Sequence, residues 1–473
     1  MNPTNKKIKF GTDGWRAIIG EDFIPENCEK VIQAFCDVSL EKSRGKKVIL
    51  GYDRRLHAQE TAILACEVLA GNGFTVLLSD QYCPTPCISW MVKVSDAFAG
   101  IMITASHNPW QWNGIKFKEG YGGSASPAYT QEVEQKIIEN DRAKIKIKKM
   151  SMALAEEKGL VKRFSPKQDY IKQLRSLLDV QAIQNSGFKI LNDPLFGAGT
   201  HFIKDTLQIP VDEIHTAADP KFGGLNPEPI DKNLGELMSQ MKTGKWDVGL
   251  ATDGDADRIG AVDENGNFVN SHQIFALLLK HYVEHKKLKG TIIKSVSATQ
   301  MIAILCKKYN IECIETPIGF KHICEKLVEH NALMGGEESG GLSFAPHVHE
   351  RDGVLNALFL VEMMSVRQKK LGELIAELFA EIGFFYSDRV DLHLERAQIE
   401  ALQAKLSATK MQTIAGKKIT SINRLDGFKY LFEDNSWLLL RASGTEPLLR
   451  IYAEAASPDA VKKLLDAGTS LIC

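Results

Sequence analysis

Two kinds of apolar pattern alternate along the first 380 residues of the chain. Between Val31 and Val38 the apolar residues recur every three or four positions, which predicts a helix that buries one face. Runs such as KVILGYD (47–53) and FTVLLSD (74–80) are continuous and bounded by polar residues, as buried strands are. A stretch of helical periodicity separates these two runs, and another apolar run covers 98–103. The first unit is therefore predicted to alternate strands with helices.

Two further units repeat this alternation. The second opens with FKILNDPL (188–195) and runs to WDVGLAT (246–252), and the third covers about 291–341. The units are alike in pattern, although their sequences are not visibly similar. Alternation of this kind predicts mostly parallel sheets covered by helices. In such sheets ligands bind beyond the carboxyl ends of the strands, so we expect functional residues in the loops that follow apolar strands.

After about residue 380 the pattern changes to strand-like runs that belong to a smaller α+β domain. Residues 433–436 separate two of these runs and predict a hairpin turn. AKIKIKKM (143–150) alternates lysine with isoleucine and predicts an exposed linker or an edge strand. The predicted fold is α/β with four domains: three related units with mixed or parallel sheets, and a smaller C-terminal α+β domain. The expected domains are 1–148, 149–262, 263–380 and 381–473.

Composition and charge narrow the class of protein. A chain of 473 residues is too long for one hydrophobic core. Its 58 Lys and Arg balance 59 Asp and Glu, which favours neither nucleic acid nor a membrane surface as partner. The start, MNPTNKKIKFGTDG, has no apolar leader, and no run approaches the ~18 apolar residues of a membrane span. Nine scattered cysteines predict buried, reduced thiols, so we expect a cytoplasmic protein.

The run 98–103 ends abruptly at Thr104-Ala105-Ser106-His107-Asn108-Pro109. Ser, Asn and Pro are ordinary turn residues, so a plain turn is one interpretation. The other is that the turn presents the hydroxyl of Ser106 as an exposed reactive group.

A sharper signal is DGDADR, which follows the apolar run VGLAT. Asp253, Asp255 and Asp257 alternate there and place three carboxylates around one point. Crowded anions repel one another unless a cation lies among them, and carboxylate oxygens select Mg²⁺ or Ca²⁺. The spacing also fits the first positions of an EF-hand, but Arg258 stands where that loop needs glycine and the flanking segments resemble strands rather than helices. A solvated acidic turn is the remaining alternative to a metal site.

Two further loops suit a phosphorylated sugar. GGEESGG (335–341) offers carboxylates and a hydroxyl between glycines, which allow close backbone approach to a ligand. RASGTEP (441–447) follows an apolar strand and combines a basic residue with successive amides that can form an anion nest. Arg450 has two interpretations: it adds positive charge to this loop, or, as we expect from the sequence, it is an ordinary surface arginine.

These loops together indicate phosphoryl transfer on a phosphorylated polyol, where catalysis consists mostly of positioning and charge neutralisation. A serine hydrolase is the rival interpretation, but the chain lacks the G-x-S-x-G elbow around Ser106. No Walker A loop supports an ATP-driven kinase.

The chain resembles the α-D-phosphohexomutase family, which includes phosphoglucomutases and phosphomannomutases. The resemblance rests on TASHNP, DGDADR, GEESGG and RASGTEP in the family's order, with FGTDGWR, NGIKF and TPIGFK, and spans residues 10 to 454. It implies a heart-shaped arrangement of four domains around a central cleft. It also implies that Ser106 carries a phosphoryl group. Mg²⁺ would be held by Asp253, Asp255, Asp257 and an oxygen at Ser106.

The resemblance further implies roles for other residues. Arg16, His107 and Arg258 match residues around the phosphoserine, and Lys321 matches a cleft residue. Lys116 matches a proposed general acid/base, which would need a lowered pKa; a phosphate-binding cation is the alternative. The sugar hydroxyls would bind Glu337 and Ser339, and the distal phosphate would bind Arg441, Ser443, Gly444 and Thr445.

The implied reaction interconverts hexose 1-phosphate and hexose 6-phosphate through a hexose 1,6-bisphosphate, with glucose 1,6-bisphosphate as activator. Ala442 replaces a proline common in the family, and Gly341 stands where some relatives carry histidine, which favours glucose or mannose over glucosamine. We expect an intramolecular phosphotransferase that acts on glucose phosphates. Phosphomannomutase, phosphoglucosamine mutase and phosphopentomutase activities are the alternatives, together with a phosphosugar phosphatase and a non-catalytic sensor. Both a monomer and a dimer fit the sequence.

Overall fold

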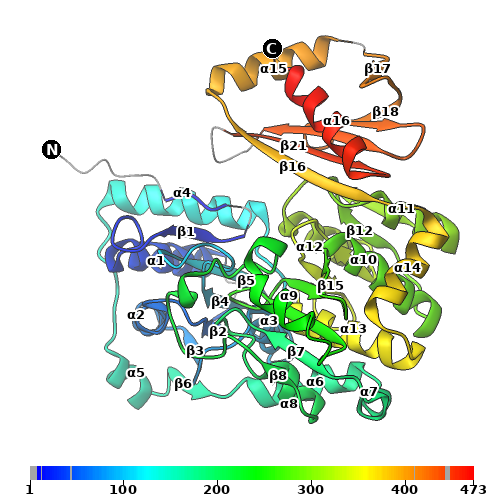
Figure 1. Cartoon of the computed structure of the whole chain (residues 1–473). Helices are drawn as coiled ribbons and strands as arrows, with labels where there is room; N and C mark the ends of the chain where they lie inside the picture. Colours follow the sequence, from blue (N-terminus) through cyan, green and yellow to red (C-terminus); the bar gives the residue numbers. More distant parts are fainter. Residues whose placement is uncertain (1–7, 12, 43–44, 410, 443–447, 473) are drawn as a thin grey trace.

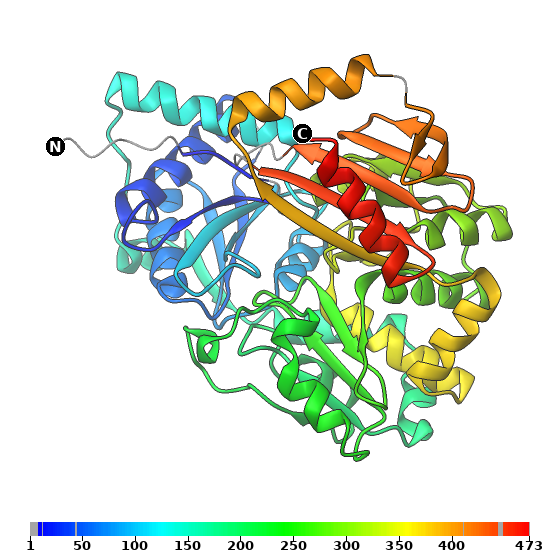
Figure 2. The same cartoon turned by 45° about the horizontal axis from the view of Figure 1, so that its top comes forward.

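Four β-sheets follow one another along the chain in the computed structural model, which describes residues 8–11, 13–42, 45–409, 411–442 and 448–472. In Figure 1 the N-terminal domain is blue to cyan, the second domain green, the third yellow-green to yellow, and the C-terminal domain orange to red. The C-terminal domain lies against the third domain in both views (Figures 1 and 2). The predicted fold class is confirmed: three α/β domains with mixed sheets precede a C-terminal domain with an antiparallel sheet.

The N-terminal domain has a six-stranded sheet. Its elements are β1 Trp15–Ile18, α1 Pro25–Glu41, β2 Lys47–Tyr52, α2 Ala58–Gly71, β3 Thr75–Ser79, α3 Thr85–Val94, β4 Ala99–Ile103, β5 Trp112–Glu119, α4 Pro127–Ala143, α5 Met152–Glu157 and β6 Val161–Phe164. The strand order is β1-β5-β4-β2-β3-β6, with β2 parallel to β3 and β4 and with β5 antiparallel to β4. Residues 145–150 form no helix or strand and link α4 to α5.

The second domain has a five-stranded sheet. Its elements are α6 Lys167–Leu177, α7 Val180–Ser186, β7 Ile190–Asp193, α8 Phe202–Leu207, β8 Asp212–Glu213, η1 Phe222–Gly224, η2 Asp231–Asn233, α9 Gly235–Met241, β9 Val248–Thr252, β10 Ile259–Val262 and β11 Phe268–Val269. The order is β11-β10-β9-β7-β8, with β7 parallel to β8 and β9 and with β10 antiparallel to β9.

The third domain repeats this plan with four strands. Its elements are α10 Ser271–Lys280, η3 His281–His285, β12 Ile292–Ser295, α11 Gln300–Tyr309, β13 Cys313–Thr316, α12 Phe320–Glu329, β14 Met334–Gly336, β15 Leu342–Phe344, α13 Gly353–Arg367 and α14 Leu371–Ile382. In the order β13-β12-β14-β15, β12 is parallel to both neighbours and β15 is antiparallel to β14.

The C-terminal domain has an antiparallel sheet of order β16-β21-β20-β19-β18-β17. Its elements are β16 Tyr386–His393, α15 Arg396–Ala408, β17 Thr413–Ile414, β18 Lys417–Asn423, β19 Phe428–Phe432, β20 Trp437–Ala442, β21 Leu448–Ala455 and α16 Pro458–Ser470. The turn predicted at 433–436 joins β19 to β20.

The first three sheets share the placement of their functional loops. In each, a strand of the parallel part continues into an antiparallel neighbour: β4–β5, β9–β10 and β14–β15. The loop that joins each pair holds one predicted motif: 104–111 with the serine, 253–258 with the aspartates and 337–341 with the paired glutamates. All three loops follow the carboxyl end of a parallel strand, as the sequence predicted.

Helix α13 holds the second and third domains together. Residues 353–365 are all buried, and the helix packs on α7, β9 and β10 of the second domain and on α10 of the third. A helix that is apolar all round belongs in the middle of a core. The two domains consequently hold their loops in fixed contact: the Ile259 amide donates to the Gly340 carbonyl at 3.1 Å.

The C-terminal domain docks on the third domain through an apolar cluster with a charged group beside it. The cluster contains Val296, Ile318, Trp437, Leu439 and Tyr452. Beside it, Lys429 Nζ donates to the Val296 carbonyl (2.7 Å) and to Glu315 Oε1 (3.1 Å). Lys294 Nζ lies 2.8 Å from the same Glu315 oxygen.

In the described part of the chain, none of the helices has the length and apolar character needed to cross a membrane. The eight cysteines that the structure describes are free thiols, and Cys313 alone among them is partly accessible.

Candidate active site

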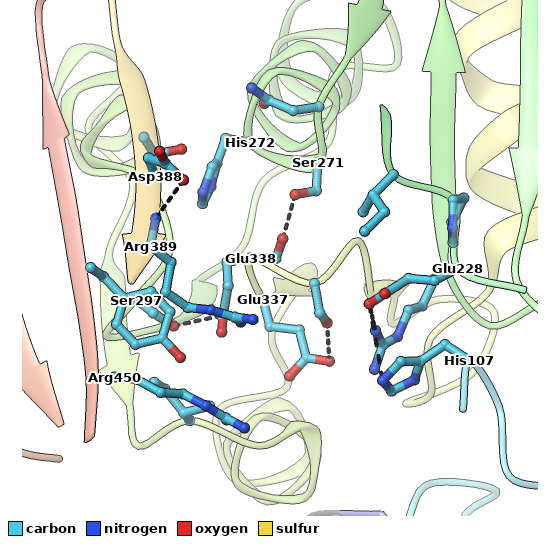
Figure 3. Close-up of a pocket in the computed structure, with 18 of the residues that line it drawn as sticks. His107, Glu228, Ser271, His272, Ser297, Glu337, Glu338, Asp388, Arg389 and Arg450 are labelled. Atoms are coloured by element: carbon cyan, nitrogen blue, oxygen red, sulfur yellow. Dashed lines mark hydrogen bonds and ion pairs between the residues drawn. The ribbon is translucent and has the colours of Figure 1, made fainter. Parts of the chain in front are cut away.

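A cleft of about 800 Å³ lies between the four domains. Figure 3 shows residues of all four around it: His107 of the first, Glu228 of the second, Glu337 of the third and Arg450 of the fourth. The cleft therefore gathers the loops that the sequence singled out, together with side chains that it did not.

Ser106 occupies the turn between β4 and β5. Its backbone adopts the left-handed conformation, with φ of 54°, and its Oγ donates to Asp253 Oδ2 at 2.7 Å. The sequence predicted an exposed hydroxyl, and this expectation is wrong, because Ser106 is fully buried. The aspartate loop of the second domain covers it, so its accessibility is decided by a segment far away in the sequence.

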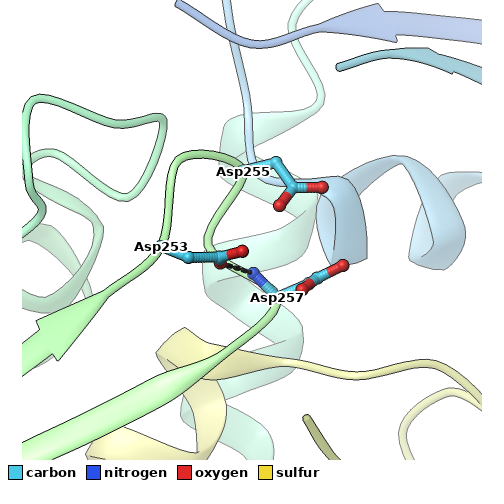
Figure 4. A group of neighbouring side chains, drawn as sticks. All are labelled: Asp253, Asp255 and Asp257. Atoms are coloured by element: carbon cyan, nitrogen blue, oxygen red, sulfur yellow. Dashed lines mark hydrogen bonds between the residues drawn. The ribbon is translucent and has the colours of Figure 1, made fainter. Parts of the chain in front are cut away.

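Asp253, Asp255 and Asp257 are buried, and each has an oxygen within 4.8 Å of the others (Figure 4). Burial and the two neighbouring carboxylates raise the pKa of Asp253 well above its ordinary value. Among the described residues, Asp255 Oδ1 and Asp257 Oδ1 are buried with no hydrogen-bond partner. Crowded carboxylates with unsatisfied oxygens are the donor set of a hard divalent cation, so these residues fit Mg²⁺.

Lys116 lies beside this triad. Its Nζ is 2.7 Å from Asp13, 2.8 Å from Asp255 and 2.9 Å from Asp257. Although burial by itself lowers the pKa of an ammonium group, these carboxylates raise the pKa of Lys116 above its ordinary value. This direction is opposite to the one a general base requires. The charged ammonium fits the alternative interpretation of Lys116, a cation that binds phosphate.

Arg351 is a residue that the sequence analysis missed. Its guanidinium is buried and forms ion pairs with Asp13, with Asp257 (2.7 Å) and with Glu337 (3.2 Å). It thereby joins the first, second and third domains at the floor of the cleft. No motif marks Arg351, because its partners come from three distant segments; Asp13, in contrast, lies inside FGTDGWR and could have been singled out.

The three residues predicted to surround a phosphoserine lie together at one end of the cleft. Arg16 donates to Asn108 Oδ1 at 2.6 Å, and Arg258 donates to Glu228 Oε1 at 3.4 Å. His107 Nε2 lies 4.0 Å from the same Glu228 oxygen. Burial together with the cationic charge of Arg258 and Arg16 lowers the pKa of His107, so the imidazole is neutral at neutral pH.

The loop 337–341 lies at the centre of the cleft (Figure 3). Glu337 Oε1 accepts a hydrogen bond from Ser339 Oγ at 2.7 Å, so the two residues predicted to bind hydroxyls are in contact. Glu338, the second glutamate of this motif, also lines the cleft, and Ser297 Oγ donates to its carboxylate at 2.5 Å (Figure 3).

The other end of the cleft is cationic. Arg441 lines it and is held by Asp426 Oδ2 at 2.8 Å. Arg389 and Arg450 extend from the C-terminal domain toward Glu337 and Glu338 (Figure 3). The expectation that Arg450 is an ordinary surface arginine is therefore wrong.

Six of the predicted residues line the cleft: Arg16, His107, Arg258, Glu337, Ser339 and Arg441. Five others are fully buried beside it and do not line it: Ser106, Lys116, Asp253, Asp255 and Asp257. The remaining four are not placed in the cleft. Ser443, Gly444 and Thr445 lie outside the residues that the structure describes. Lys321 lines a small cavity of about 10 Å³ beside Asp13 and Ser124 rather than the main cleft.

The chain matches models of the four successive domains of one family over most of its length. These are described as "Phosphoglucomutase/phosphomannomutase, alpha/beta/alpha" domain I, II and III and C-terminal domain, at residues 7–144, 168–266, 270–382 and 391–468.

Individual proteins are similar over nearly the whole chain. A "Phosphoglucomutase/phosphomannomutase" of Thermococcus kodakarensis is 31% identical over 467 residues, covering 98% of both chains. A "Phosphoglucosamine/phosphogalactosamine mutase" of Sulfurisphaera tokodaii is 29% identical over 97% of both. The crystal structure of a Thermus thermophilus protein, provisionally assigned as a phosphomannomutase, superposes with a TM-score of 0.85 and 32% identity, covering 98% of this chain and 99% of that one.

Proposed function

Because the chain belongs to the phosphoglucomutase/phosphomannomutase family, whose members are enzymes of phosphoryl transfer and isomerisation, we propose that it interconverts hexose 1-phosphate and hexose 6-phosphate. The proposed route passes through phosphorylated Ser106 and a bound hexose 1,6-bisphosphate. In cells we place this reaction in the cytoplasm.

One observation carries the proposal: a serine hydroxyl lies 2.7 Å from a carboxylate of a buried aspartate triad. A hydrolase would need a base oriented on that hydroxyl. Here the partner of Ser106 is instead a group that fits Mg²⁺, which suits a phosphoryl group carried on the serine. A phosphoserine bears about −1.5 to −2 charge at neutral pH and needs such compensation.

The reaction balances in two transfers. The bond between phosphorus and Ser106 Oγ breaks as phosphorus bonds to the free sugar hydroxyl, which loses its proton, and Ser106 Oγ regains one. The bisphosphate then reverses its orientation, and its other phosphoryl group returns to Ser106 by the same exchange. Bound Mg²⁺ would neutralise phosphoryl charge at Asp253, Asp255 and Asp257.

The charges along the cleft support this reversal. Arg16 and Arg258 lie at the Ser106 end, and Arg389, Arg441 and Arg450 lie at the other end. A bisphosphate that exchanges its ends needs a cationic site for each phosphate. Glu337 and Ser339 line the cleft between the two ends, which supports the proposal that they bind hydroxyls of the ring.

We propose glucose phosphate as the substrate, with mannose phosphate accepted as well. A site that barely contacts C2 would bind both epimers. Glucosamine phosphate is the second candidate, because several similar proteins are named as phosphoglucosamine mutases, among them one of Caldicellulosiruptor saccharolyticus that is 29% identical over 98% of both chains.

The test is a coupled assay for the 6-phosphate, started with glucose, mannose or glucosamine 1-phosphate in the presence of Mg²⁺ and catalytic glucose 1,6-bisphosphate. Ser106→Ala is expected to lose turnover, and intact mass spectrometry is expected to find one removable phosphoryl group on wild type and none on the variant. Release of inorganic phosphate without the 6-phosphate would indicate a phosphatase. Turnover retained by Ser106→Ala would refute the proposed route.

A further inference from the structure

Arg55, which no motif marks, packs against the inside of the Ser106 turn. Its guanidinium donates to four backbone carbonyls of this segment: Ser106 (2.5 Å), Asn108 (2.6 Å), Pro109 (3.0 Å) and Trp112 (3.0 Å). The side chain is fully buried. One planar group with five donors in fixed directions therefore spans the whole turn.

The amide of Ser106 is held from the same side. It donates to Thr104 Oγ1 at 2.8 Å, and Thr104 Oγ1 donates to Asp53 Oδ2 at 2.5 Å. The same Asp53 oxygen lies 3.3 Å from Arg55 Nε. Asp53 and Arg55, two residues apart after β2, thus fix both the amide and the carbonyl of the serine.

The turn needs this support for two reasons. A left-handed backbone is sterically unfavourable for an L-residue, and Ser106 adopts it with φ of 54°. The carbonyl of Ser106 is also shielded from water, so leaving it without a hydrogen-bond donor would be unfavourable. The left-handed turn is the conformation in which Ser106 Oγ reaches Asp253.

We propose that Arg55 is a positioning residue for phosphoryl transfer, which holds the Ser106 turn so that its oxygen faces the metal-binding carboxylates. The inference rests on the proposed function. Arg55 touches the backbone of the turn and is not assigned to any proton or phosphoryl transfer.

The preceding residue provides a matched control. Arg54 also uses its guanidinium to hold backbone, but on the second domain, where it donates to the Thr216 carbonyl (2.9 Å) and Thr200 Oγ1 (3.0 Å). Within the described part of the chain, none of its hydrogen bonds reaches the Ser106 turn. Arg54→Lys and Arg55→Lys both keep a positive charge and remove a planar donor group, so they differ in which backbone they release.

The experiment compares both variants with wild type in two measurements. In the mutase assay, Arg55→Lys is expected to lower kcat about 100-fold with KM for the 1-phosphate nearly unchanged, because a misplacement near 1 Å costs about that factor. Arg54→Lys is expected to keep kcat near wild type. In hydrogen exchange, peptides covering 104–112 are expected to exchange faster in Arg55→Lys alone.

The two measurements separate the inference from the proposed function. Equal kcat losses in both variants, or unchanged exchange of 104–112 in Arg55→Lys, would overturn the positioning role. A wild type that turns over no hexose phosphate would refute the proposed function, while hydrogen exchange would still decide whether Arg55 holds the turn.

Discussion

Replacing Lys429 with methionine is expected to stabilise the protein at neutral pH, although it removes a hydrogen-bonded charge. Lys429 is fully buried between the third and C-terminal domains. Burial and the nearby ammonium of Lys294 lower the pKa of Lys429 to about 8, and Glu315 opposes this shift only in part. The folded state therefore bears a cost for keeping this lysine charged.

The size of the cost follows from the shift in pKa. A drop from the ordinary value of about 10.4 to about 8 corresponds to about 3 kcal/mol at pH values below both. The Lys429 ammonium lies 4.7 Å from the centre of the Trp437 ring, and a cation–π contact returns about 0.5–2 kcal/mol. Methionine fills a similar volume without charge, but it removes the hydrogen bond to the Val296 carbonyl, which costs about 1 kcal/mol. A net gain of about 1 kcal/mol is therefore expected at pH 7.

The pH dependence has a definite sign. Between about pH 8 and 10.4 the unfolded chain keeps a proton on Lys429 that the folded protein has released. Wild-type stability therefore gains from this group as pH rises through that window, whereas the variant lacks the group. The free energy of unfolding of Lys429→Met should exceed that of wild type by the largest amount below pH 8, and this difference should decrease toward pH 10.

The assay is urea unfolding of wild type and Lys429→Met at several pH values from 7 to 10. Lys418→Met is the control, because Lys418 lies on the neighbouring strand β18 with its side chain 71% exposed. The free energy of unfolding of Lys418→Met should differ little from that of wild type, and the difference should not change between pH 8 and 10. A Lys429→Met variant that is less stable at pH 7, or a difference that does not change with pH, would refute the reasoning.

Three other substitutions test the cleft and its support. Asp253→Asn should weaken Mg²⁺ binding by more than about tenfold in calorimetry and lower kcat with it, whereas intact Mg²⁺ affinity would argue against the triad as the metal site. Glu337→Gln should raise KM for hexose 1-phosphate about 10-fold or more while Mg²⁺ affinity stays constant; an unchanged KM would remove Glu337 from sugar binding. Tyr170→Phe should cost about 1–3 kcal/mol in urea unfolding, because the buried hydroxyl lies 2.8 Å from each oxygen of Asp352 and donates its one proton to that carboxylate. A neutral result there would mean that the carboxylate finds another partner.

The strands were predictable because strands in parallel sheets read as continuous apolar runs. The runs 98–103 and 246–252 contain β4 and β9, and the helical spacing between Val31 and Val38 lies within α1. The position of each functional loop followed from the same rule, since it begins where an apolar run stops. The strands, the helices and the positions of the functional loops could thus be predicted from the sequence.

Burial by other domains and ion pairs between domains could not be predicted from the sequence. Ser106 is covered by a loop 147 residues away, and a local turn pattern contains no information about that cover. Lys116 has its pKa set by three carboxylates from two other segments, so the sequence could not give the direction. Arg351 has no local signature at all, because its role is to join partners from different domains.

The three hairpin loops occupy equivalent places in three separate sheets. As a result, each group of candidate functional residues is carried by a different domain. The loops 104–111 and 253–258 hold the serine and the three aspartates, while 337–341 holds Glu337, Glu338 and Ser339, which line the cleft. Under the proposed function we expect changes in the last loop to act first on sugar preference, although Glu337 is also linked to Asp257 through Arg351. The architecture therefore allows one hairpin to vary while the serine and the aspartates stay on two other sheets, and proteins similar over nearly the whole chain bear the names of different sugars.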